Sequence, residues 1–315
     1  MPPQRKSKKK KACVDGGAAV NGGRGESSLG QTLEAWLQEG PFTLVLSSSF
    51  FGFYAHAGVL AALLEVGAVP SGMAGSSGGA VIAGMWAAGM TIEQILETMR
   101  TLTPGELLKF ARPWREPGGI FSTAQVQQNL QRRIDKYKLA QRLEDCAVPV
   151  ALSTFDVLGV ETRALCTGGV ASAITASIAV PLFFTPAWSD KRPLVDGGIG
   201  DIAGLKGVSV ENRVLYHHAC VVPSRMTAIR HYQNSVTFCI PDLPFINPFT
   251  LAQADTAFTV AKDATTQGLH QAVSKDLGCQ QFVFRSSQTC APEAHGARFS
   301  RRLFGRCCWR RHKQC

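Results

Sequence analysis

The chain has 315 residues, a length that suits one large domain with a sizeable buried core. Its formal net charge of +10 comes from its two ends: residues 1–30 hold seven Lys/Arg and two acids, and residues 286–315 hold seven Lys/Arg and one acid. The 19 basic and 20 acidic residues between them leave the middle nearly neutral, so the basic charge says little about that domain's own substrate.

The number and spacing of the cysteines indicate the redox state of the compartment. The ten cysteines are scattered, with no Cys-x-x-Cys pair and no His/Cys cluster with metal-ligand spacing. We therefore expect no metal, free thiols and a reducing compartment, hence a cytoplasmic protein. The basic N-terminus is not followed by an apolar stretch, so no secretory signal is expected. Thiols expected to be buried are Cys146, Cys166, Cys220, Cys239 and Cys279.

Two runs without Asp, Glu, Lys or Arg, residues 40–64 and 66–91, are long enough to be membrane spans. The first contains Ser47-Ser-Ser49 and His56, and the second contains Pro70 and a Gly/Ser cluster. A buried strand followed by a buried helix explains each run better than a spanning helix.

The predicted elements alternate along residues 31–285. Helices are expected over residues 32–39, 54–65, 80–90, 91–102, 122–134, 171–179 and 251–273, with a short one restarting at Thr103. Strands are expected over residues 42–46, 67–73, 149–156, 161–166, 193–198, 213–222, 236–240 and 281–284. Strands alternating with helices predict an α/β domain with a mainly parallel sheet that is covered on both faces. Residues 1–30 and 286–315 are expected to be tails, the first disordered.

The stretch Gly75-Ser-Ser-Gly-Gly79 matches Gly-x-Ser-x-Gly with Ser77 at its centre. It lies between a predicted strand and an apolar helix, where a sharp turn would expose the serine hydroxyl. The free N–H groups at the start of that helix favour negative charge there, as a serine nucleophile requires. The alternative is an ordinary Gly/Ser loop that caps a helix.

The base that Ser77 needs is predicted to be Asp196. Asp196 ends a strand and precedes Gly197-Gly198, at the edge where α/β sheets place their chemistry. A partly desolvated carboxylate can take the serine proton. An ordinary turn is the alternative, and Asp201 is a weaker acid candidate. The histidines are less suitable, since His56 and one of His217 and His218 are better explained as core residues.

An oxyanion hole would use two backbone sources. One is the N–H of Gly78, the residue after the nucleophile. The other is the loop that ends the first strand, residues 48–53, and Ser49, Phe50 and Phe51 are the expected donors.

Four short segments in order resemble patatin-like phospholipases over roughly residues 40–285: Leu44–Leu60, Gly75–Gly79, Ala176–Pro186 and Asp196–Gly198. The resemblance implies a three-layer α/β/α domain and a Ser–Asp dyad that hydrolyses acyl esters of lipids without a metal or other cofactor. It implies that Ser77 is the nucleophile, that Asp196 is its base and that residues 176–186 form part of the site wall. We predict that Phe50, Phe53, Pro181 and Phe183 contact the substrate.

One departure from the family pattern stands out. The usual Gly-Gly-Gly-x-Arg/Lys-Gly loop is replaced by Ser48-Ser-Phe-Phe-Gly-Phe53, without its basic residue. A position that needs positive φ would cost about 1–2 kcal/mol with serine or phenylalanine in place of glycine. Two interpretations stay open: a divergent, active subgroup, and a catalytically inactive relative that binds lipid or a protein partner.

The basic tails suggest further partners. The C-terminal tail mixes cations with Phe, Leu and Trp, which suggests peripheral attachment to an anionic membrane, helped by acylation of Cys307 or Cys308. The alternative is a tail without a binding role. Specific nucleic-acid recognition is disfavoured, since no aromatic residues interleave with the N-terminal basic run.

Overall fold

The computed structural model describes residues 30–101, 109–112, 114–189, 191–219, 229, 231–244, 246, 250–274 and 278–287. The predicted N-terminal tail lies outside these residues, as do almost all of the C-terminal tail and the short helix expected at Thr103. The predictions about both tails therefore stay predictions.

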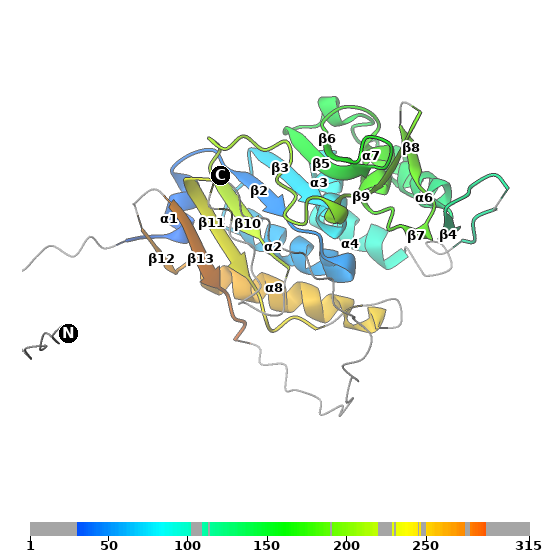
Figure 1. The fold of residues 1–315 in the computed structure, drawn as a ribbon. Coiled ribbons are helices and arrows are strands. Elements are labelled where there is room, and N and C mark those ends of the chain that lie inside the picture. Colours follow the sequence, from blue (N-terminus) through cyan, green and yellow to red (C-terminus); the bar gives the residue numbers. More distant parts are fainter. Residues whose placement is uncertain are drawn as a thin grey trace, which may run out of the picture.

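A nine-stranded sheet forms the centre of the molecule, in the order β13-β11-β10-β2-β3-β5-β9-β8 with β6 on the other edge of β5 (Figure 1). The strands from β13 to β5 run parallel, and β6, β8 and β9 pair antiparallel. Their bounds are β2 Thr43–Leu46, β3 Gly72–Ser76, β5 Val150–Asp156, β6 Glu161–Leu165, β8 Ala187–Ser189, β9 Arg192–Asp196, β10 Val214–His217, β11 Asn234–Cys239 and β13 Gly278–Val283.

Helices flank this sheet, which confirms the predicted α/β class with a mainly parallel central sheet. The α-helices are α1 Leu33–Gln38, α2 Phe53–Glu65, α3 Gly78–Ala87, α4 Ile92–Thr101, α6 Thr123–Lys136, α7 Val170–Ser177 and α8 Ala254–Gly268. The 3-10 turns are η1 Phe50–Gly52, η2 Leu143–Asp145, η3 Gly197–Ile199 and η5 Leu251–Gln253. Among the described helices, none has both the length and the apolar character that a membrane span needs.

The core lies mainly on one face of the sheet. Side chains alternate along β2, so Leu44 and Leu46 enter a large core with the helices, while Val45 faces a smaller cluster that contains Tyr216 and Tyr232. Helices α2 and α8 pack closely in the large core. Gly58 allows this close approach because it has no side chain, and a Cβ there would collide with the Phe258 carbonyl oxygen. This packing holds the first strand, α2 and the loop between them in place.

Two predicted elements were misplaced. The strand before Ser77 spans Gly72–Ser76 instead of residues 67–73, because its small residues pair with both neighbours and are all buried. The predicted helix over residues 251–273 ends at Gly268, and β12 (Ala272–Val273) instead pairs with β1 (Gln31–Thr32).

The thiols fit their predicted burial only in part. The described cysteines, Cys146, Cys166, Cys239 and Cys279, are all free. Cys239 is buried and Cys166, which follows β6, is exposed, while Cys146 and Cys279 are half-buried. Cys220 lies outside the described residues. No group of three or more His, Cys, Asp or Glu that could hold a metal occurs within the described part of the chain.

Candidate active site

Ser77 forms a sharp turn between β3 and α3. Its backbone has φ 49° and ψ −119°, a conformation that costs energy for any residue other than glycine. Gly75 and Gly79, on either side of Ser77, have no room for a side chain. A Cβ on Gly75 would lie 2.6 Å from the carbonyl carbon of Gly79, and one on Gly79 would collide with the Leu46 carbonyl oxygen. The motif therefore forms the predicted strand-turn-helix, with the serine at its apex.

The sheet brings Asp196 to this apex because β3 and β9 both pair with β5. Strand β3 runs parallel to β5 and pairs with it up to Ser76, opposite Ser153. Strand β9 runs the other way and pairs with β5 up to Asp196, opposite Thr154. Because β6 pairs with the opposite edge of β5, β3 and β9 share one edge and meet end to end. Ser77 and Asp196 are therefore neighbours although 119 residues separate them.

The two side chains form a short hydrogen bond. Ser77 Oγ donates to Asp196 Oδ2 at 2.6 Å, and the N–H of Gly198 donates to Asp196 Oδ1 at 2.7 Å. Ser77 is only 6% exposed and Asp196 only 5%. This burial raises the pKa of Asp196, and the hydrogen bonds from Ser77 and Gly198 oppose that rise. The carboxylate is therefore desolvated and correctly placed to accept the serine proton.

Another serine, Ser177, holds the backbone of Ser77, and the sequence analysis did not single it out. The N–H of Ser77 donates to Ser177 Oγ at 2.9 Å, and Ser177 Oγ donates to the Ser153 carbonyl oxygen at 2.6 Å. Two residues further on, the Ala179 carbonyl oxygen accepts the N–H of Asp196 at 3.0 Å. Ser177 lies in the segment expected to form the site wall, but a serine at the end of a helix carries no signal of this role.

The loop after β2 lies directly against the start of α3. A Cβ on Gly78 would be 2.5 Å from Ser49 Oγ and 3.5 Å from the Phe50 nitrogen. The N–H groups of Ser49, Phe50 and Gly78 take no hydrogen-bond partner among the described residues. Phe50 has φ 53°, so the expected strain occurs at a phenylalanine. Within the described part of the chain these three backbone donors are thus unpaired, in the region predicted for an oxyanion hole.

The residues predicted to contact substrate occupy different environments. Phe50 is exposed, and Pro181 and Phe183 are exposed beyond the end of α7. Phe53 is half-buried and, with the predicted donor Phe51, packs against the large core. Three of the four substrate-binding candidates are therefore open to solvent around the pair.

Asp201, the weaker acid candidate, makes hydrogen bonds that hold a loop. It accepts hydrogen bonds from Ser153 Oγ at 2.6 Å and from the N–H groups of Gly204 and Lys206 at 2.9 and 2.8 Å. These bonds hold the loop after η3 in place, and Asp201 makes none with Ser77.

Two of the buried histidines, His56 and His217, hold the strand end before the loop. His56 Nε2 lies 2.9 Å from the Ser47 carbonyl oxygen, so this nitrogen is protonated and donates a hydrogen bond to that oxygen. His56 Nδ1 then accepts from His217 Nδ1 at 2.8 Å, which leaves His217 Nε2 buried without a partner among the described residues. Burial lowers the pKa of His56 to about 4 and that of His217 well below its ordinary value. Both rings are structural, as predicted for His56, and neither bonds to Ser77.

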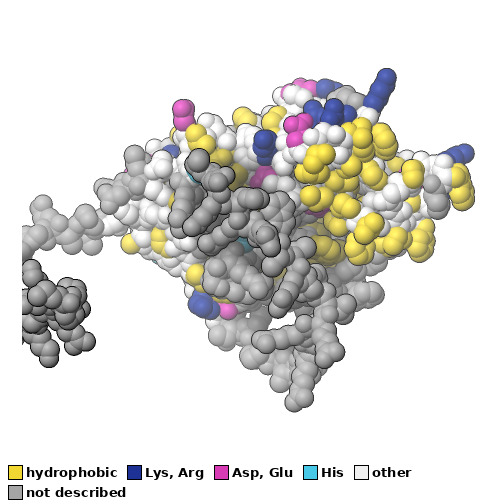
Figure 2. All heavy atoms as spheres, viewed as in Figure 1, with side chains coloured by type: hydrophobic (Ala, Val, Ile, Leu, Met, Phe, Trp, Pro, Cys, Tyr) yellow, Lys and Arg dark blue, Asp and Glu magenta, His cyan; other side chains and the backbone are white. Residues whose placement is uncertain are grey.

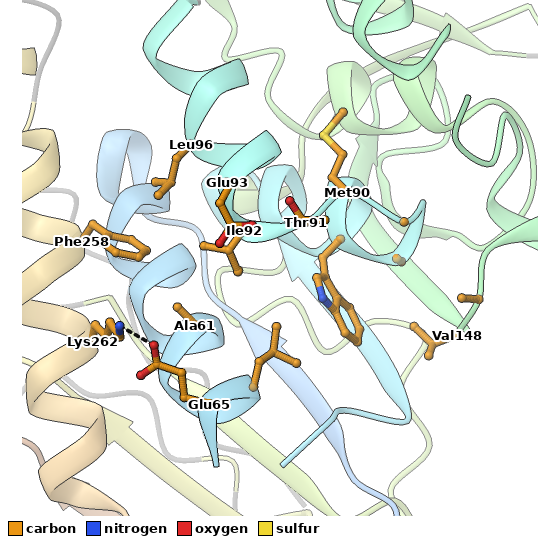
Figure 3. A pocket seen from close by; sticks show the side chains of 15 residues that line it. Ala61, Glu65, Met90, Thr91, Ile92, Glu93, Leu96, Val148, Phe258 and Lys262 are labelled. Carbon is orange, nitrogen blue, oxygen red and sulfur yellow. Dashed lines mark ion pairs between the residues drawn. The ribbon is translucent and has the colours of Figure 1, made fainter. Parts of the chain in front are cut away.

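A separate cavity of about 740 Å³ lies between α2, α4, α8 and the end of α3 (Figure 3). Ile92 and Phe258 line it, and Glu65 and Lys262 form an ion pair of 2.5 Å at its side. Ser77 precedes the other end of α3, about 15 Å away for a helix of ten residues. The cavity is therefore not part of the Ser77–Asp196 site.

Comparisons with known proteins identify the family of the chain. Residues 44–205 match the family described as patatin-like phospholipase. Uncharacterized NTE family proteins of Mycobacterium bovis and Mycobacterium tuberculosis are each 32% identical over 171 residues, which cover 53% of this chain and 46% of theirs. The chain thus spans about half the length of these curated relatives.

Among solved structures, VipD from Legionella pneumophila is similar, with a TM-score of 0.42 and 14% identity over 68% of this chain and 52% of that one. The family match covers more than half of the sequence and includes the turn at Ser77 and the strand that carries Asp196. The chain belongs to the patatin-like phospholipase family.

Proposed function

We propose that the protein is a serine hydrolase that cleaves acyl esters of lipids, with Ser77 as nucleophile and Asp196 as its base. The observation that carries the proposal is the 2.6 Å hydrogen bond from Ser77 Oγ to Asp196 Oδ2. A serine hydroxyl is a weak nucleophile until a neighbouring base takes its proton, and a buried carboxylate with a raised pKa suits this task.

The proposed reaction has two halves. Ser77 Oγ attacks the ester carbonyl carbon while its proton passes to Asp196. The negative oxygen accepts hydrogen bonds from the N–H of Gly78 and from the Ser49, Phe50 and Phe51 backbone. The alcohol leaves with the proton from Asp196, and the acyl group stays on Ser77. Water then attacks this acyl-serine, Asp196 takes its proton, and the fatty acid leaves as Ser77 Oγ regains a proton.

A fluorophosphonate probe tests the nucleophile directly. Wild-type protein should become labelled on the peptide that contains Ser77, and Ser77→Ala should abolish labelling. Ser76→Ala is the matched control, since Ser76 Oγ is buried and makes no hydrogen bond within the described residues. Label on another serine would contradict the assignment, and a folded wild type that takes no label would favour the inactive, lipid-binding alternative.

A further inference from the structure

Large apolar side chains gather on the surface beside the site instead of in the core. Each is at least half exposed, from 52% for Ile120 to 80% for Trp114. Figure 2 shows hydrophobic side chains gathered over the part of the molecule where Figure 1 has β4, β7, β8 and β9. We call this surface the apolar rim, made of Phe110, Trp114, Ile120, Leu182, Phe183 and Trp188.

Backbone pairing joins the segments of the rim. Strand β4 (Gly119–Phe121) pairs parallel with β7 (Leu182–Phe184), which sets Gly119 opposite Leu182. Phe110 bridges to Phe121, and the two rings lie 5.7 Å apart. Trp188 lies on β8, opposite Pro193 of β9. These contacts join Phe110, β4 and β7, and Figure 2 shows hydrophobic side chains gathered over this part of the molecule. An exposed apolar patch of this kind marks an interaction site.

Two segments of the rim lead to elements that hold Asp196. Leu182 is three residues beyond Ala179, whose carbonyl oxygen accepts the N–H of Asp196 at 3.0 Å. Trp188 lies on the strand that pairs with β9, and β9 ends at Asp196. A partner on the rim would therefore contact segments that lead within a few residues to Asp196, the proposed base.

The charges around the rim are mainly positive. Lys109, Arg112, Arg115 and Lys191 are exposed on the same segments. Of the nearby acids, Glu116 is held by Ser122 Oγ at 2.6 Å, while Glu161 on β6 is exposed. Tryptophan and phenylalanine beside exposed cations suit the boundary between lipid headgroups and acyl chains, where anionic lipid attracts the cations.

We propose that the apolar rim docks the protein on a bilayer that contains anionic lipid and presents the membrane's own esters to Ser77. This inference rests on the proposed function for its substrate, but the docking itself does not depend on catalysis. It assigns membrane binding to the folded domain instead of to the basic tails.

The test uses the full chain and vesicles of equal parts phosphatidylcholine and phosphatidylserine. Trp114→Ser/Ile120→Ser/Trp188→Ser should reduce co-sedimentation at least about tenfold, because three large side chains no longer enter the bilayer. The matched control is Val69→Ser/Val210→Ser, which replaces two exposed apolar residues in loops outside the rim and should bind like wild type. Both variants should hydrolyse a soluble short-chain ester like wild type if Ser77 is the nucleophile.

Four outcomes separate the docking from its rivals. Equal vesicle binding by the rim variant and wild type would overturn the proposal. Equal binding to vesicles of phosphatidylcholine alone would overturn its electrostatic part. A rim variant that loses self-association in light scattering but keeps vesicle binding would assign the rim to a second copy of the chain instead. Rim-dependent binding by a wild type that cleaves no ester would support docking and remove the proposed function.

Discussion

Replacement of Asp196 by asparagine is the sharpest test of the proposed chemistry. Asparagine has the same shape, and its Oδ1 can still accept the N–H of Gly198, which now lies 2.7 Å from the carboxylate. Its amide nitrogen would replace Oδ2, 2.6 Å from Ser77 Oγ, and would donate to that oxygen instead of taking its proton. The variant therefore removes the base and leaves the packing intact.

The expected loss follows from the role of a general base. We expect Asp196→Asn to lower kcat for a chromogenic short-chain ester about 10²–10⁴-fold, or about 3–5 kcal/mol in activation free energy. Ser77→Ala should lose at least as much, and the double variant little more than either, because the two groups act as one unit. The melting temperature of Asp196→Asn should not fall, since burial already disfavours the charge on this carboxyl.

Asp201→Asn provides the matched control in the same loop. Asp201 holds Ser153 Oγ and two backbone N–H groups, so its amide variant should lower stability and leave kcat of the folded protein within a few-fold of wild type. If Asp196→Asn kept more than about a tenth of wild-type kcat while remaining folded, Asp196 would not be the base.

Three further predictions concern pH and stability. Because burial raises the pKa of Asp196, kcat/KM should rise with pH through a midpoint above the ordinary aspartate value of about 3.9, and a stopped-time assay across acidic buffers measures this midpoint. The pKa of His56 is about 4 in the folded protein, so between pH about 6.5 and about 4 the unfolded chain binds a proton at this residue that the folded chain does not. The free energy of unfolding should therefore drop by about 3 kcal/mol by pH about 4. Urea titrations of His56→Gln should show a smaller drop. Phe50→Gly should leave the free energy of unfolding unchanged or raise it by up to about 1 kcal/mol, because relief of the left-handed backbone outweighs the added entropy of the unfolded chain. Phe51→Gly, which empties a contact with the core, should lower that free energy in the same denaturant titration.

The parts that the sequence predicted well depend on local patterns. Gly75 and Gly79 around Ser77 indicated a tight turn, and the structure shows why no side chain fits at either glycine. The apolar runs of β2 and α2 gave those elements within a residue or two of their ends. The pairing of Ser77 with Asp196 rested on family resemblance and on the rule that strands end at one edge of a sheet.

The parts that it missed depend on contacts between distant segments. No local pattern shows that β3 and β9 share one edge of β5, or that Ser177 accepts the N–H of Ser77. The apolar rim was not predicted for the same reason. Leu182 and Trp188 are apolar residues of the kind expected in buried strands, and only the three-dimensional structure shows that they are exposed.

The end-to-end meeting of β3 and β9 has a consequence for synthesis on the ribosome. Ser77 leaves the exit tunnel long before Asp196, since 119 residues separate them. Under the proposed chemistry, a growing polypeptide holds a serine without its proton acceptor until β9 has docked. If the dyad acts as proposed, chains that lack this strand would cleave no ester, and the appearance of activity during translation would report the moment at which the strand joins the sheet.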